Sequence, residues 1–91
     1  MTVNYTGWLY STTAADHKGQ QFETSVGRGP YTFVLGSGAV IKGWDQGLVG
    51  MKVGGRRELV LPPELAYGVN GYQGIPGNAT LIFDVDLVSV Q

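Results

Sequence analysis

Cysteine is absent from this 91-residue chain, so neither a disulfide framework nor a thiolate zinc site is available to it. Histidine occurs once, at His17, in a polar segment where we expect it to be solvated. A serine-type nucleophile needs a base that orients it, and no second histidine is there to share the proton-transfer roles. A metal site needs several clustered ligands, whereas Asp84 and Asp86 form only a pair on one face of an expected strand. The sequence therefore predicts no metal and no cofactor.

Charged residues and long apolar runs are also scarce. A charged fraction of 14% and a net charge of −1 do not favour electrostatic binding to nucleic acid or to anionic lipid. No apolar run approaches the roughly 20 residues that a membrane span needs. No basic-then-apolar start marks a signal peptide. From these absences we expect a cytoplasmic protein without nucleic-acid or membrane partners.

Glycine and apolar residues are, by contrast, abundant. The 15 glycines imply many tight turns, which fits a β-rich fold better than a helical one. The 43% apolar content predicts a single globular domain over residues 1–91. Several segments alternate between apolar and polar residues, as half-buried strands do. The expected strands are residues 2–10, 21–25, 31–35, 56–61 and 80–90, and the expected long loops are 11–19 and 63–77.

One short helix is expected between two glycine-rich turns. Its buried face would be the apolar stripe of Val40, Ile41, Trp44, Leu48 and Met51. Gly43, Gly47 and Gly50 also recur at helical spacing, although each costs a helix roughly 1 kcal/mol relative to alanine. Such glycines indicate that another backbone or a ligand approaches closely. These patterns predict an α+β fold, a twisted antiparallel sheet of about four to five strands with one wet face and a short α-helix on its apolar face.

Aromatic side chains come from nearly every expected element. They are Tyr5, Phe22, Tyr31, Phe33, Trp44, Tyr67, Tyr72 and Phe83. One interpretation is an ordinary core, because a small domain must bury its large side chains somewhere. The other is a concave site for a small apolar ligand, because aromatic walls with a few polar tips are typical of such sites. These features alone leave both interpretations open.

Six segments together resemble an FKBP-type peptidyl-prolyl cis-trans isomerase domain, in the order and with the spacing of that family. They are residues 3–7 (VNYTG), 21–25 (QFETS), 40–44 (VIKGW), 50–54 (GMKVG), 62–68 (PPELAYG) and 79–85 (ATLIFDV). The resemblance runs from Thr2 to Val90. It implies an FKBP-like fold, isomerisation of Xaa-Pro bonds in polypeptides, and binding of macrolides such as rapamycin and tacrolimus.

The resemblance also assigns site residues, position by position. Trp44 matches the indole that floors the family's pocket, and the Tyr67 hydroxyl and the Ile41 N–H match donors to bound carbonyls. The residues assigned to catalysis are Glu23, Tyr67, Trp44 and Phe83. The residues assigned to substrate binding are Tyr5, Phe22, Tyr31, Phe33, Val40, Ile41, Tyr72 and Ile75. Glu23 would orient the Tyr5 hydroxyl and pair with Arg28.

Three departures from the family pattern bear on activity. Glu23 stands where aspartate is usual, and we expect its extra methylene to displace the carboxylate from Tyr5. Pro76-Gly77 replaces a common pair of prolines, and the 11–19 loop is longer than in minimal members. A non-catalytic module that binds proline peptides or macrolides therefore stays open as the alternative. A purely structural or chaperone-like domain would leave the aromatic pocket unexplained.

The resemblance implies, finally, that one strand lacks a neighbour. Family members usually begin earlier, with a strand that pairs with the one matching residues 56–61. Here Met1 leads directly into Thr2, so we expect a domain without the family's N-terminal strand. The 56–61 strand would then be a free edge, blunted by Arg56 and Arg57, and the domain would be destabilised or would self-associate through that edge. The alternative is that the sequence belongs to a longer protein that supplies the missing strand.

Overall fold

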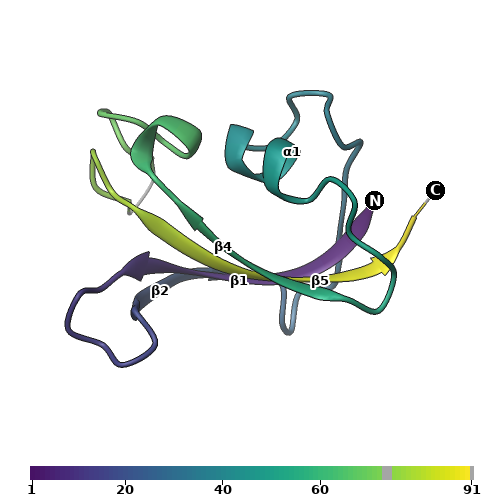
Figure 1. Ribbon diagram of the computed structural model, residues 1–91, viewed down its shortest axis with the longest axis horizontal. Helices are drawn as coiled ribbons and strands as arrows, with labels where there is room; N and C mark the ends of the chain where they lie inside the picture. Colours follow the sequence, from purple (N-terminus) through teal and green to yellow (C-terminus); the bar gives the residue numbers. More distant parts are fainter. Residues whose placement is uncertain (73–74, 91) are drawn as a thin grey trace.

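The elements of the structure, a computed structural model that describes residues 1–72 and 75–90, follow the predicted order. They are β1 (Thr2–Tyr10), β2 (Lys18–Thr24), β3 (Tyr31–Thr32), α1 (Lys42–Gly47), β4 (Arg56–Leu61), the 3₁₀ helix η1 (Pro63–Leu65) and β5 (Leu81–Ser89). The strands form one antiparallel five-stranded sheet in the order β2-β1-β5-β4, with β3 paired to β1. Helix α1 lies on one side of this curved sheet (Figure 1). The predicted α+β fold is confirmed.

The pairing of β1 with β5 determines which side chains face the helix. Tyr5 lies opposite Val85, and Gly7 lies opposite Phe83. A Cβ at Gly7 would come within 2.7 Å of the rings of Phe22 and Phe83, so glycine leaves the space in which these two rings meet. The period-two prediction for β5 holds on this face, where Phe83 is 3% exposed and Val85 is fully buried.

The outer face of the sheet is less polar than predicted. Ile82 points away from the helix, yet it is only 1% exposed. Its partners across the sheet are Trp8 on β1 and Val60 on β4. The Lys18 ammonium lies 4.6 Å from the centre of the Trp8 ring and 2.8 Å from Asp84. A small apolar cluster, closed by a cation–π contact, therefore interrupts the expected wet face.

Three element boundaries differ from those predicted. β2 begins at Lys18, because the strand pairing extends to Tyr10 opposite Lys18 and shortens the polar loop. β3 ends at Thr32, opposite the first residue of β1, and the chain turns at Gly36, whose φ is +85°. α1 covers only Lys42–Gly47, with Gly50 at φ +80° just beyond it. Val40, Ile41 and Met51 therefore flank the helix instead of belonging to it.

Helix α1 packs against β4 through its glycines, as the sequence predicted for a close approach. A Cβ at Gly43 would lie 2.5 Å from Leu61, and one at Gly47 would lie 2.9 Å from Leu59. The missing side chains let the helix backbone approach the strand, and Trp44 is thereby held over the sheet. Among residues 1–72 and 75–90, no helix has the length and apolar character to cross a membrane.

Strand β4 lies at one edge of the sheet. Within the described part of the chain it pairs with β5 alone. The Gly54 N–H donates to the Leu87 carbonyl at 2.9 Å, and the Leu87 N–H donates to the Gly55 carbonyl at 3.0 Å. Because antiparallel ladders alternate, the backbone groups of Arg56, Glu58 and Val60 point away from β5. The expected free edge is therefore present in the described residues.

Candidate active site

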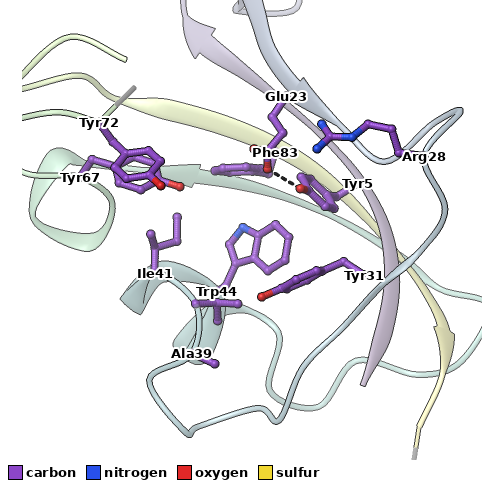
Figure 2. A pocket seen from close by; sticks show the side chains of 11 residues that line it. Tyr5, Glu23, Arg28, Tyr31, Ala39, Ile41, Trp44, Tyr67, Tyr72 and Phe83 are labelled. Atoms are coloured by element: carbon purple, nitrogen blue, oxygen red, sulfur yellow. Dashed lines mark hydrogen bonds between the residues drawn. The ribbon is translucent and has the colours of Figure 1, made fainter. Parts of the chain in front are cut away.

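A pocket of about 530 Å³ opens between the apolar face of the sheet, helix α1 and the loops around them (Figure 2). Its lining residues are Tyr5, Glu23, Arg28, Tyr31, Ala39, Val40, Ile41, Trp44, Tyr67, Tyr72 and Phe83. The structure thus brings together nine residues that the sequence analysis assigned to a site, from five of the elements and two loops. The aromatic residues do more than fill a core.

Trp44 forms the floor of this pocket and is only 4% exposed. Its indole lies nearly perpendicular to the rings of Tyr5 and Phe83, with ring centres 4.9 Å and 5.4 Å away. Edge-to-face packing of this kind stabilises aromatic pairs beyond their burial and fixes the orientation of the rings. The Trp44 Nε1 is buried without a hydrogen-bond partner in the described residues.

Three residues of the expected site lie behind the pocket wall. Phe33 is 6% exposed and stacks on Tyr31, with ring centres 5.7 Å apart. Phe22 packs perpendicular to Phe83 at 5.6 Å. Ile75 is 7% exposed and belongs to the core cluster. These side chains support the lining residues, and their direct contact with a substrate stays a prediction.

Glu23 reaches Tyr5 across the paired strands β1 and β2. The Tyr5 hydroxyl donates a hydrogen bond to Glu23 Oε1 (Figure 2). Burial, and secondarily this carboxylate, raise the pKa of Tyr5 well above its usual value near 10. Tyr5 is also fixed from behind, because its N–H donates to the buried Ser25 Oγ at 2.9 Å. The expected contact between Glu23 and the Tyr5 hydroxyl is therefore present, and the expectation that the extra methylene displaces the carboxylate from Tyr5 is wrong.

The predicted ion pair between Glu23 and Arg28 is absent from the described residues. No salt bridge within 4.0 Å joins the two side chains, although both line the pocket. Arg28 follows a turn in which its N–H donates to the Ser25 carbonyl, and its guanidinium lies beside Tyr5 and Glu23 at the pocket without pairing with the carboxylate (Figure 2). The Glu23 carboxylate is instead occupied by the Tyr5 hydroxyl, which sequence spacing alone could not decide.

Tyr67 and Tyr72 form a second aromatic wall. Their rings stack at 5.2 Å with an angle of 14° between the planes, and both hydroxyls point to the same side of the pocket (Figure 2). The loop after η1 is held by the Gly68 N–H, which donates to the Pro63 carbonyl at 2.8 Å. Burial first, and then the Glu23 carboxylate, raise the pKa of Tyr67. Tyr67 therefore stays a hydrogen-bond donor at neutral pH.

The Ile41 backbone supplies a further donor. Its carbonyl accepts the N–H groups of Trp44 and Asp45 at the start of α1. No hydrogen bond within residues 1–72 and 75–90 uses the Ile41 N–H, and Ile41 lines the pocket. Such an N–H can donate a hydrogen bond to the carbonyl oxygen of a bound ligand. Beside it, Ala39 is a lining residue that the sequence analysis missed, and only its adjacency to Val40 could have indicated it.

The chemistry of the pocket follows from these parts. The floor and walls are aromatic or aliphatic, and the charged residues among the lining are Glu23 and Arg28. The uncharged donors include the Tyr67 hydroxyl and the Ile41 N–H. Such a site can exclude water from a small apolar group and hold its flanking carbonyls. It is suited to binding and to conformational catalysis rather than to proton transfer between a nucleophile and a base.

Known proteins are similar to this chain in sequence and in fold. The sequence model of the family described as FKBP-type peptidyl-prolyl cis-trans isomerase matches residues 1–88. The chain is 48% identical over 93 residues to FK506-binding protein 2B of Rhizopus delemar, covering 100% of this chain and 42% of that protein. It is 50% identical over 92 residues to the FK506-binding protein of Neisseria meningitidis serogroup B, covering 99% of this chain and 78% of that protein.

Solved structures agree with this assignment. The crystal structure of FkpA from Escherichia coli superposes with a TM-score of 0.82 at 47% identity, covering 99% of this chain and 38% of that chain. The crystal structure of AtFKBP13 superposes with a TM-score of 0.84 at 38% identity, covering 100% and 78%. The chain thus spans less than half the length of the Rhizopus and Escherichia proteins. The match over residues 1–88 and these identities show that the chain belongs to the FKBP-type peptidyl-prolyl cis-trans isomerase family.

Proposed function

We propose that this chain catalyses cis-trans isomerisation of Xaa-Pro bonds in polypeptides. The observation that carries the proposal is the pocket itself, in which Trp44 floors an apolar cavity while the Tyr67 hydroxyl and the Ile41 N–H lie at its margin. A prolyl ring is small and apolar, and it is flanked on both sides by carbonyl groups. The site therefore matches a prolyl segment in shape and in hydrogen bonding.

The reaction needs no covalent chemistry. Rotation about a prolyl amide interrupts its resonance and has a barrier of about 18–20 kcal/mol in ordinary peptides. The twisted amide is less polar than the planar one, so a pocket that excludes water favours the twisted form over the ground state. A 10⁴-fold acceleration needs only about 5.4 kcal/mol of preferential stabilisation, at about 1.36 kcal/mol for each factor of ten. Desolvation together with one or two hydrogen bonds is of that size.

The proposal assigns roles to several residues of the site. Trp44 and Phe83 hold the prolyl ring, and Phe33 supports the wall from behind. Tyr67 and the Ile41 N–H bind the flanking carbonyls. Glu23 keeps the Tyr5 hydroxyl in place at the side of the ring.

A protease-coupled assay on Xaa-Pro peptides tests the proposal, with rapamycin and tacrolimus as competitors. We expect acceleration over the uncatalysed rate and inhibition by both macrolides, because they would occupy the same apolar floor. Trp44→Ala should lose most of the activity. A folded sample that gives only the uncatalysed rate would disprove catalysis. Tight macrolide binding by that same sample would support the alternative, a non-catalytic binding module.

We further propose that the chain self-associates through the edge of β4. The outward backbone groups of Arg56, Glu58 and Val60 can accept a second strand, and Arg56 is held by Asp86 at 2.7 Å instead of covering the edge. Val60→Pro removes one outward N–H without interrupting the pairing with β5, so it should yield a monomer. Light scattering over a range of concentrations measures this. A monomer at all concentrations whose outward amides exchange quickly would disprove self-association.

A further inference from the structure

The loop between β3 and α1 delivers part of the pocket lining, although it has little support of its own. Ala39, Val40 and Ile41 at its end line the pocket. Residues 36–39 are largely exposed, so burial does not hold this part of the loop in place. Gly36 and Gly38 have φ angles of +85° and +79°, and a Cβ at either would meet open space. The conformation of this loop therefore depends on hydrogen bonds.

The Val34 carbonyl accepts the N–H and the hydroxyl of Ser37 within this loop, and Asp45 supplies the acceptors from helix α1. Its Oδ1 accepts the Gly36 N–H at 2.9 Å, and its Oδ2 accepts the Gly38 N–H at 3.1 Å. The Asp45 N–H donates in turn to the Ile41 carbonyl at 3.3 Å. Hydrogen bonds to an ionised carboxylate are roughly twice as strong as those between neutral groups. Both oxygens of one side chain thus bind the loop to the helix that carries the pocket floor.

The position of Asp45 gives this contact a functional consequence. Asp45 follows Trp44 directly in α1, so its carboxylate fixes the loop relative to the indole. The Ile41 N–H has no partner in the described residues, Ile41 lines the pocket, and this N–H belongs to the residue where the loop meets the helix. If the loop detached from Asp45, the floor would stay in place while the Ile41 donor would move.

We propose that Asp45 is a positioning residue for the isomerase site, which holds the 36–41 loop so that the Ile41 N–H meets a substrate carbonyl. This inference rests on the proposed function. The side chain itself does not line the pocket, and it acts through the loop. When only a fraction of molecules holds the binding-competent loop, apparent affinity falls by that fraction.

The test compares Asp45→Ala and Asp45→Asn with Asp16→Ala. Asp16 also accepts a backbone N–H, from Lys18 at 3.0 Å, in the 11–17 loop away from the pocket lining. We expect Asp45→Ala to lower kcat/KM about tenfold and to raise the KM and the Kd for tacrolimus. Asp45→Asn keeps one acceptor oxygen, so its kcat/KM, KM and Kd should lie between those of Asp45→Ala and the wild type. Asp16→Ala should have the wild-type values. In NMR spectra the Gly36 and Gly38 amide protons of Asp45→Ala should exchange faster.

The outcomes separate this role from simple support of the fold. If Asp45 had a purely structural role, its replacement would lower the fraction of folded protein in urea titrations. The KM and the Kd of the molecules that remain folded would be unchanged, and this result would overturn the proposal. If Asp45→Ala does not fold, the KM and Kd of Asp45→Asn test the proposal instead. Wild-type values for Asp45→Asn would also overturn the proposal. A folded wild type that neither isomerises nor binds would disprove the proposed function and this role together. An active wild type with unchanged Asp45 variants would disprove this role alone.

Discussion

Residue 23 shows how one side chain can tolerate a change in length. The Glu23 carboxylate accepts a hydrogen bond from the Tyr5 hydroxyl. It does so although the glutamate side chain is one methylene longer than the aspartate that the family resemblance suggests at this position. The longer side chain has rotamers enough to return the carboxylate to its partner. The departure from the family pattern therefore leaves the hydrogen bond to Tyr5 intact.

We expect Glu23→Asp to keep kcat/KM within roughly threefold of the wild type, and Glu23→Ala to lower it about tenfold. A tenfold loss is about 1.4 kcal/mol, close to the ~1.5–3 kcal/mol that a hydrogen bond to a charged group contributes. The protease-coupled assay measures both variants. Equal and large losses in the two would mean that the site needs the glutamate length.

The two pocket tyrosines also predict how stability depends on pH. Burial is the first cause of the raised pKa of both Tyr5 and Tyr67. In the unfolded chain a tyrosine ionises at its ordinary pKa of about 10, while these two stay protonated in the folded state. The stabilisation is therefore complete below about pH 10 and is lost as pH rises through the higher folded values.

We accordingly expect the free energy of unfolding to fall steeply above about pH 10. Urea titrations between neutral and strongly alkaline pH measure the slope. Tyr5→Phe and Tyr67→Phe should each flatten it, because each variant removes one group that ionises only after unfolding. An unchanged slope in both variants would contradict the role of burial.

At the scale of elements, helix α1 is shorter than the apolar spacing of the sequence predicted. Alternation of apolar residues predicted β1, β4 and β5 to within one residue at each end, whereas the bounds expected for β2 and β3 differed from the structure by up to three residues. The helical stripe overestimated α1, because Val40 and Met51 continue its spacing outside Lys42–Gly47. Loop hydrogen bonds and the left-handed conformation of Gly50 end the helix there. The spacing of apolar residues carries no information about these two features.

Two glycines in α1 allow a matched comparison. A Cβ at Gly43 would lie 2.5 Å from Leu61, which is buried, whereas one at Gly47 would lie 2.9 Å from Leu59, which is partly exposed at the sheet edge. We expect Gly43→Ala to destabilise the fold by about 1–3 kcal/mol, as overpacked cores do. Gly47→Ala should be nearly neutral, because Leu59 can move and alanine favours the helix by ~1 kcal/mol. Urea denaturation measures both, and the opposite ranking would contradict this view of the interface.

On the scale of the whole molecule, the pocket joins elements that are distant in the sequence. Tyr5 on β1, Trp44 in α1, Tyr67 beyond η1 and Phe83 on β5 all border it. A ligand there contacts most of the fold at once. Binding of such a ligand should therefore raise the free energy of global unfolding, and not only that of a local opening.

Tacrolimus at about 100 times its Kd should raise the free energy of unfolding by about 2.7 kcal/mol. Chemical denaturation with and without the macrolide measures this difference. Trp44→Ala should lose the effect, while Val60→Thr, whose side chain lies on the outer face, should keep it. Equal stabilisation of both variants would place the macrolide elsewhere.

The sequence by itself determined the strands, the fold class and most of the lining. Period-two alternation indicates which face of a strand is apolar, and the six family-like segments contain most of the residues that line the pocket. Both kinds of signal are linear, because they depend on residue type and on spacing along the chain. For the same reason Glu23, Tyr67 and Trp44 could be singled out without any coordinates.

Tertiary structure alone decided how deep each side chain lies and which partner it takes. Phe33 stands behind the pocket wall, Ile82 is buried on the face expected to be wet, and Glu23 binds Tyr5 instead of Arg28. The Asp45 carboxylate holds Gly36 and Gly38, which no pattern in the sequence indicated. The physical reason is that burial and hydrogen bonding depend on what packs against a residue, and those neighbours come from elsewhere in the chain.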